Sequence, residues 1–162
     1  MTERWLDEIE MRAWVAFLDT SNLLQRRLDQ QLREDGGLTQ PQYELLTRLA
    51  EAPGQRMRMA ELALALVASR SGLTYQVTQL EKAGLVRREA CAGDDRGVLA
   101  ALTEQGVQAL RRAAPGHLRV VRENLIDLLD RDQLVTLADT LGRARTHLRT
   151  AGGDEPRRTG SS

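Results

Sequence analysis

Residues 69–103 read SRSGLTYQVTQLEKAGLVRREACAGDDRGVLAALT and predict one helix followed by two short strands. Ser69 carries a hydroxyl suited to capping a helix, and Gly84 supplies the left-handed conformation in which helices commonly end. Between them, three apolar residues recur at helical spacing and form one stripe: Leu73, Val77 and Leu80. We therefore expect a helix over residues 70–83 with one buried face.

A β-hairpin is predicted to follow this helix. Short apolar runs at 85–89 and 98–102 flank a polar turn at 92–97. Upstream, the capping box at 39–42 opens a helix to residue 51, whose buried face is expected to hold Tyr43, Leu46, Leu49 and Ala50. A shorter helix is expected over 59–66. The order helix, helix, turn, helix, strand, strand is that of a winged helix-turn-helix domain.

Long helices are predicted on both sides of this domain. An apolar stripe runs through residues 5–34. A second long helix starts at Thr103 and continues through a kink at Pro115, and its inner face is expected to include Val107, Leu110 and Leu118. The last helix is expected to begin with a capping box at 130–133. It has an apolar heptad seam that needs a partner helix, formed by Leu134, Leu137, Leu141, Ala144 and Leu148. We expect a mainly α fold (α+β) with an N-terminal dimerisation helix (1–37), a winged helix-turn-helix DNA-binding domain (38–103), C-terminal dimerisation helices (104–150) and a disordered tail (151–162).

The composition excludes several classes of protein. Apolar residues make up 41% of the chain but aromatic ones only 3%, so the core is aliphatic, which favours helices over a sheet sandwich. No apolar run reaches the roughly 18–20 residues of a membrane span, and we see no secretory signal. Because Cys91 is the only cysteine, an internal disulfide is impossible. We expect a cytoplasmic protein without a membrane partner.

The charge balance gives DNA binding only weak support. The formal net charge is zero, although residues 53–103 hold 7 basic and 5 acidic side chains. Of the 23 basic residues, 22 are Arg. A GC-rich genome would explain this bias. Whatever its cause, an Arg side chain can make a bidentate hydrogen bond to guanine, whereas Lys acts as a point charge.

The outward face of the 70–83 helix is suited to reading DNA. It is expected to carry hydroxyls, amides and one cation, which can hydrogen-bond base edges and phosphates in a major groove. Glu81, beside Lys82, is the only acidic residue there. The alternative is an ordinary solvated face, but such faces usually hold several Glu and Lys residues, which are scarce here.

Several motifs in this order and spacing resemble those of the MarR family of transcriptional regulators, over roughly residues 10–150. They are LTQPQY at 38–43, MAELA at 59–63, SRSGLT at 69–74, LEKAGLVRR at 80–88, DDRGV at 94–98 and LTEQG at 102–106. The resemblance implies a homodimer whose terminal helices interlock and whose two winged domains read a pseudo-palindrome. It also implies that Arg96, braced by Asp94, enters the minor groove, while Asp95 replaces a cation common in the family.

The residues that we expect to contact DNA are Ser69, Arg70, Ser71, Thr74, Tyr75, Gln76, Gln79, Arg87, Asp94 and Arg96. For Arg96 the alternative is a surface ion pair with Asp94. Since Arg87 and Arg88 alternate along a strand, only one of them can readily face a phosphate.

A small effector is the second expected partner, besides double-stranded DNA and a second copy of the chain. Trp14, Tyr43 and His117 come from the helices that line the effector cleft in the resembled family. Their polar tips on apolar bodies suit an aromatic or amphipathic acid, with Arg12 or Arg119 as counter-charge. The alternative is that Trp14 and Tyr43 belong to the core.

No catalytic, metal or cofactor site is predicted. His117 and His147 have no partners at metal-ligand spacing, and Cys91 lies in the wing near acidic residues that disfavour a thiolate. The function that we infer is a ligand-responsive repressor that binds DNA and is not an enzyme. The alternative is a helical scaffold whose winged domain binds protein, which the neutral charge would permit.

Overall fold

The computed structural model describes residues 4–66 and 68–151, with the backbone alone at 94–96 and 151. Within the described residues the chain divides into two compact units, Met1–Val121 and Arg122–Ser162. Of the predicted tail at 151–162, residues 152–162 lie outside the described residues.

The first unit begins with the long helix α1 (Glu8–Gly36), which starts three residues later than predicted. Its cap is Asp7, whose carboxylate accepts from the backbone N–H groups of Ile9 and Glu10, while the Glu10 side chain accepts from the Asp7 N–H. Gly37, in the left-handed conformation with φ 63°, ends it. Only the C-terminal end of α1 is buried, at Leu28, Gln31 and Leu32.

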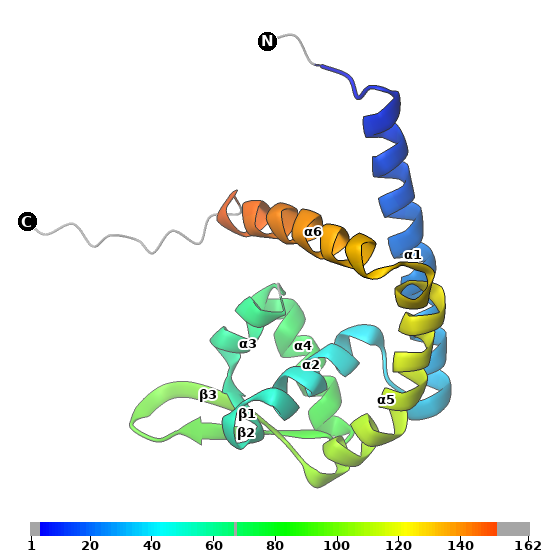
Figure 1. Ribbon diagram of the computed structural model, residues 1–162. Helices are drawn as coiled ribbons and strands as arrows, with labels where there is room; N and C mark the ends of the chain where they lie inside the picture. Colours follow the sequence, from blue (N-terminus) through cyan, green and yellow to red (C-terminus); the bar gives the residue numbers. More distant parts are fainter. Residues whose placement is uncertain (1–3, 67, 152–162) are drawn as a thin grey trace, which may run out of the picture. The chain divides into compact units, whose positions relative to one another are not determined.

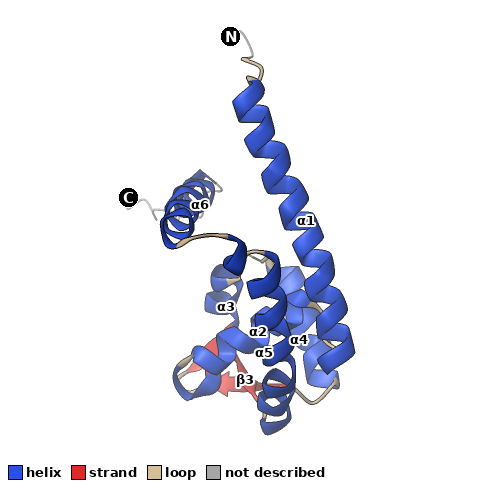
Figure 2. Cartoon of the chain, turned by 45° about the vertical axis from the view of Figure 1, so that its right-hand side comes forward, coloured by secondary structure: helices blue, strands red, loops and turns tan. Residues whose placement is uncertain are grey.

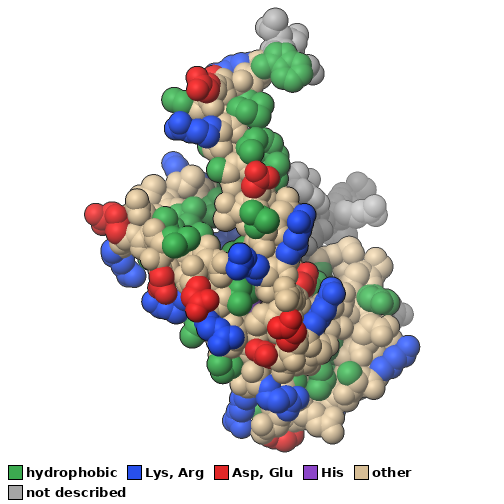
Figure 3. Space-filling view, turned by 90° about the vertical axis from the view of Figure 1, so that its right-hand side faces the viewer, with side chains coloured by type: hydrophobic (Ala, Val, Ile, Leu, Met, Phe, Trp, Pro, Cys, Tyr) green, Lys and Arg blue, Asp and Glu red, His purple; other side chains and the backbone are tan. Residues whose placement is uncertain are grey.

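The apolar side chains of the N-terminal half of α1 are exposed. Figure 3 shows hydrophobic side chains along this part of the helix. They include Ile9, Met11, Trp14, Val15, Phe17, Leu18 and Leu23. An apolar helix surface of this length is what the sequence predicts for a dimerisation helix.

The three helices of the predicted winged helix-turn-helix domain are α2 (Gln40–Glu51), α3 (Met59–Ala65) and α4 (Arg70–Lys82). The predicted capping box of α2 is present, because Thr39 Oγ1 accepts from the Gln42 N–H at 3.4 Å and Gln42 Oε1 accepts from the Thr39 N–H at 3.0 Å. Fully buried Leu45 was missed by the prediction, which placed half-buried Tyr43 and Ala50 on the inner face.

The sheet has three strands where two were predicted. β2 (Val86–Cys91) and β3 (Asp94–Leu102) are longer than expected, so the predicted turn at 92–97 contracts to residues 92–93. The missed strand is β1 (Arg56–Arg58), which follows the short 3-10 turn η1 (Pro53–Gln55). The strand order is β1-β3-β2, antiparallel throughout, with Met57 opposite Ala100 and Arg88 opposite Ala100. Figure 2 shows the strands in red among the blue helices.

The core of this unit joins the helices to the sheet and to the end of α1. Figure 1 shows α2, α3 and α4 grouped beside the strands. The fully buried side chains at its centre are mostly leucines: Leu32, Leu38, Leu45, Leu46, Leu49, Leu62 and Leu80, with Val77 and Val86. The predicted stripe of α4 is therefore confirmed, and Gly84 has the expected positive φ of 73°. Because Leu32 belongs to this core, α1 is anchored in the winged body.

Helix α5 (Glu104–Asn124) runs continuously through Pro115, as predicted, but buries a different face. The prediction placed Val107, Leu110 and Leu118 inside, whereas the buried residues are Gly106, Ala109, Ala113 and Gly116. Leu118 is 58% exposed. Small residues face inward because α5 lies so close to α1 that the Gln31 amide donates to the Ala113 carbonyl at 3.2 Å.

The second unit holds the end of α5, the 3-10 turn η2 (Ile126–Leu128) and helix α6 (Arg131–Ala151). The predicted capping box of α6 is present. Asp130 Oδ1 accepts from the Gln133 backbone N–H, and Gln133 Oε1 accepts from the Asp130 backbone N–H, both at 2.9 Å. Across residues 131–150 no side chain of α6 is buried. The exposed apolar positions include Val135, Leu141 and Leu148.

Candidate nucleic-acid interface

Helix α4 begins at a side-chain cap and presents a largely exposed polar face. The Ser69 hydroxyl accepts from the Gly72 N–H at 3.1 Å, so the predicted cap is confirmed and that hydroxyl is engaged in the fold. Arg70, Ser71, Thr74 and Tyr75 are exposed, as predicted. Ser71, Tyr75 and Lys82 lie opposite the buried stripe by helical spacing, which makes Lys82 an outward residue that the sequence analysis left out.

The two amides predicted to face outward are not equivalent. Gln76 and Gln79 are both half-buried. Gln76 lies one turn from the buried residues Leu73 and Leu80, beside the core, whereas Gln79 follows exposed Tyr75 by one turn. Gln76 therefore lies beside the core and not on the outward face that we predicted; Gln79 is the amide nearer to that face.

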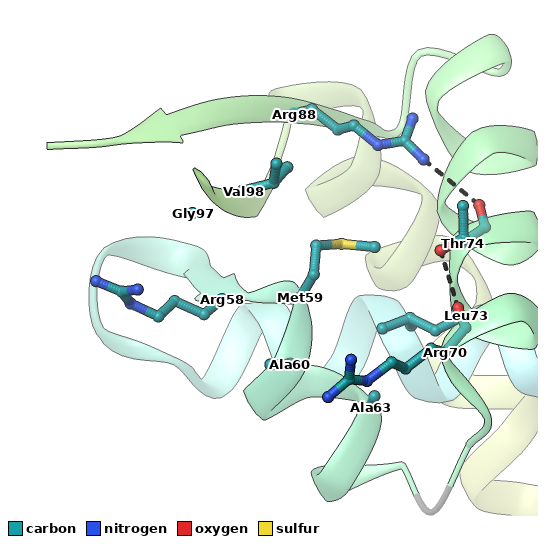
Figure 4. A pocket seen from close by; sticks show the side chains of 10 residues that line it. All are labelled: Arg58, Met59, Ala60, Ala63, Arg70, Leu73, Thr74, Arg88, Gly97 and Val98. Atoms are coloured by element: carbon teal, nitrogen blue, oxygen red, sulfur yellow. Dashed lines mark hydrogen bonds between the residues drawn. The ribbon is translucent and has the colours of Figure 1, made fainter. Parts of the chain in front are cut away.

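A groove of about 550 Å³ opens between α3, the start of α4 and the strands (Figure 4). Its floor is apolar, formed by Met59, Ala63, Leu73 and Val98. Three arginines line it: Arg58, Arg70 and Arg88. Figure 4 shows the Arg88 guanidinium directed toward Thr74, and the Arg58 guanidinium pointing away from Met59. Neither Arg58 nor Arg88 was among the predicted site residues, although RMRM at 56–59 is a basic run directly before a helix.

The neighbouring arginines of β2 lie on opposite faces of the sheet, as strand alternation requires. Arg88 hydrogen-bonds to Thr78 and Glu81 of α4. Arg87 instead donates from Nε to Glu89 Oε1 at 2.7 Å, and Glu89 also lies 3.5 Å from an Arg56 guanidinium nitrogen. Of the two, Arg87 is the more exposed, with 57% of its side chain accessible against 30% for Arg88. The side chains of Asp94 and Arg96, expected at the wing tip, lie outside the described residues.

The three predicted effector residues do not come together in one chain. Tyr43 of α2 and His117 of α5 stack with ring centroids 4.4 Å apart. Trp14 stacks instead on Phe17 of its own helix, at 6.2 Å. Trp14 precedes Gln31, the contact of α1 with α5, by 17 residues, which corresponds to about 25 Å along a helix.

The Tyr43–His117 pair is half-buried. Burial lowers the pKa of His117, and the charge of nearby Glu44 acts in the opposite direction. Burial also raises the pKa of the Tyr43 phenol. The Nε2 atom of His117 is buried and has no hydrogen-bond partner within the described part of the chain. Buried polar atoms normally have a hydrogen-bond partner, which an ordered water or a ligand would supply here.

Protonation of His117 is expected to destabilise the fold. Because its pKa is lower in the folded chain than in the unfolded one, the unfolded chain binds more protons between the two values, and stability falls as the pH drops through about 6.5. His117→Phe should therefore flatten the fall in melting temperature between about pH 7.5 and about pH 5. Thermal melts of the two proteins measure this, with His147→Phe on α6 as a control for loss of a histidine. Equal pH dependence in wild type and His117→Phe would contradict the assignment.

The remaining features concern metal binding, the single cysteine and membrane insertion. Within residues 4–66 and 68–151 no cluster of three His, Cys, Asp or Glu residues could hold a metal ion. Cys91 is a half-buried free thiol at the end of β2. None of the helices in this part of the chain has the length and hydrophobicity to span a bilayer.

Comparisons with known proteins agree with this geometry. The MarR family model matches residues 38–98, the winged domain. The solved structure of Sco3205, a MarR family transcriptional regulator from Streptomyces coelicolor in complex with DNA, is 41% identical, with a TM-score of 0.87 over 89% of this chain and 94% of that one. AbsC, a MarR family transcriptional regulator from the same organism, is 44% identical, with a TM-score of 0.87 over 91% of this chain and 99% of that one.

A curated relative gives the same result. The transcriptional regulator HosA of Escherichia coli O127:H6 is 33% identical over 100 residues, which are 62% of this chain and 73% of HosA. The resemblance inferred from the sequence motifs is thus confirmed over the winged domain and the flanking helices. The chain belongs to the MarR family of DNA-binding transcriptional regulators, which are not enzymes.

Proposed function

We propose that the protein is a ligand-responsive repressor that binds a pseudo-palindromic operator as a homodimer in the cytoplasm. Operator binding is supported mainly by the exposed face of α4. The only carboxylate of this helix, Glu81, is already paired with Arg88. A duplex approaching this face therefore meets hydroxyls, Tyr75, Arg70 and Lys82 without an unpaired acid. The DNA complex of Sco3205, at 41% identity, supports the same use of the fold.

The homodimer is supported by apolar surface that one chain leaves uncovered. The first unit exposes the apolar side chains of α1, and the second exposes those of α6. Monomeric proteins rarely expose so many large apolar residues along continuous helix faces. A two-fold dimer would cover both sets and would present two copies of α4 to two half-sites.

Salt dependence tests DNA binding against the scaffold alternative. Fragments of the source genome retained by the protein would define the operator, and its affinity would then be measured at several salt concentrations. For a DNA-binding protein the logarithm of affinity falls linearly with that of salt concentration, by about 0.9 for each phosphate neutralised. A protein that retains no fragment and shows no such slope is a scaffold, not an operator-binding regulator.

Gln79→Ala is expected to change specificity more than affinity. An amide can bind adenine through N6 and N7, which is worth about 1–3 kcal/mol of discrimination. Loss of that contact should relax base preference at one or two positions of each half-site and leave binding to random DNA nearly intact. Competition binding with a set of operator variants measures this. Gln76→Ala, on the flank beside the core, is the comparison, and a larger loss of preference for Gln76→Ala would reverse the assignment.

For the effector we propose a small aromatic or amphipathic acid near Tyr43 and His117. His117 Nε2 would donate to the acid, and the apolar rings would cover its body. The acid would release DNA if it binds more tightly to the dimer conformation in which the winged domains are spaced too far apart or too close together to engage both half-sites. Calorimetry with a panel of phenolic acids, repeated with His117→Ala and with operator present, tests the site. Acids that bind equally well to His117→Ala would place the effector elsewhere.

A further inference from the structure

One arginine of the wing is bound to the recognition helix α4 over two of its turns. The Arg88 guanidinium donates to Thr78 Oγ1 at 2.9 Å and to the Thr74 carbonyl at 3.4 Å. It also pairs with the Glu81 carboxylate, whose other oxygen accepts from the Arg88 backbone N–H at 3.1 Å. Since Thr74, Thr78 and Glu81 are spaced by four and three residues, they form one stripe on the flank of α4 that faces β2.

This arrangement explains the one residue that did not fit a DNA-reading face. A carboxylate on a recognition helix repels phosphates, yet α4 carries Glu81. Here Arg88 neutralises it, and Glu81 in turn holds both the backbone and the side chain of Arg88. The hydroxyl of Thr78 is fully used as well, because it donates to the Thr74 carbonyl at 2.8 Å while accepting from Arg88.

We propose that Glu81, Thr78 and Arg88 form a clamp that fixes the orientation of the wing on the recognition helix, so that Arg88 sets specificity without binding DNA. This inference rests on the operator recognition proposed above. Base reading requires the recognition helix and the wing to meet two grooves at once, and contacts of this kind tolerate displacements of only about 0.5 Å. A clamp that joins the two elements meets this requirement, whereas a mobile arginine would only add affinity.

The clamp differs from a phosphate contact in two measurable quantities. A phosphate contact strengthens binding to every sequence and adds about 0.9 to the salt slope, or about two for both copies in a dimer. A clamp instead raises the ratio of operator affinity to random-DNA affinity and leaves the slope unchanged. Lysine at position 88 separates the two roles further, because it keeps the charge but cannot reach Glu81, Thr78 and Thr74 together.

The experiment measures operator and random-DNA affinity at several salt concentrations for wild type, Arg88→Gln, Arg88→Lys and Glu81→Gln. Matched controls are Arg48→Gln and Glu51→Gln, which break an exposed ion pair of 3.7 Å on α2. We expect Arg88→Gln to lower the specificity ratio about tenfold, similar to one mismatched base pair, with the salt slope of the Arg48→Gln control. Arg88→Lys should recover only part of the ratio, and Glu81→Gln should bind random DNA more tightly while losing specificity.

Three results would overturn the clamp. These are a salt slope reduced by about two in Arg88→Gln, full recovery by Arg88→Lys, or a specificity ratio equal to that of the controls. Circular dichroism checks that each variant folds; should Arg88→Gln fail, Thr78→Val removes one contact of the clamp and leaves both charges in place. A wild-type protein without sequence preference would refute the proposed operator recognition, a failure distinct from any variant result.

Discussion

Replacing Gly106 with alanine is expected to lower the free energy of unfolding by about 3 kcal/mol, although alanine normally stabilises a helix by about 1 kcal/mol relative to glycine. A Cβ at this position would overlap the carbonyl oxygen of Leu85 and would come within 2.7 Å of Leu102 Cδ1. The Leu85 carbonyl cannot move away freely, because it accepts from the Thr103 N–H at 3.1 Å. The first turn of α5 would have to separate from the base of the wing.

Urea unfolding at fixed protein concentration measures this change, and Gly142→Ala is the matched control. Gly142 also lies inside a helix, α6, but a Cβ there would meet nothing within 4 Å in the same chain. Gly142→Ala should keep or raise the stability. Should both variants unfold at the wild-type urea concentration, the close approach of α5 to Leu85 would be wrong.

Leu141→Glu is expected to abolish dimerisation at micromolar concentration. Leu141 is 41% exposed in the single chain and lies on the apolar seam of α6 with Leu134, Leu137 and Leu148. In a dimer that covers this seam, glutamate would be a buried charge without a partner, which costs several kcal/mol for each copy. In the single chain the same glutamate is solvated, so the fold itself should persist.

Sedimentation velocity of the purified proteins measures the oligomeric state. Thr146→Glu, on the opposite face of α6, introduces the same charge and should leave the dimer intact. A monomeric wild type would refute the homodimer, and a dimeric Leu141→Glu would move the interface away from α6. Operator affinity should fall together with the dimer, because each chain would then bind only one half-site.

The features predicted best from the sequence are those fixed by nearby residues. The caps of α2, α4 and α6 depend on contacts within three residues, and the stripe of Leu73, Val77 and Leu80 depends on helical spacing alone. The prediction missed β1 because three residues with alternating arginines carry no strand pattern of their own. They become a strand through pairing with β3, about forty residues later in the chain.

In the candidate site, too, the features fixed by nearby residues were predicted and those fixed by distant residues were not. Exposure of Arg70 and Tyr75 follows from the helix period, whereas the position of Gln76 beside the core depends on what covers that flank of α4. On α5, periodicity selected the largest apolar residues, but the short distance to α1 and to Leu85 left room only for glycine and alanine. The partnership of Arg88 with Glu81 requires β2 to lie against α4, which no local pattern encodes.

Glu89 lies between two arginines on the other face of the wing, and this has a consequence for the kinetics of binding. When a phosphate approaches Arg87, the guanidinium can leave Glu89 while the carboxylate stays paired with Arg56, 3.5 Å away. Exchange of one anion for another would therefore leave none of the three charges without a partner. Return of Arg87 to Glu89 would be equally direct, so the phosphate contact that the sequence predicts for Arg87 is expected to be readily reversible.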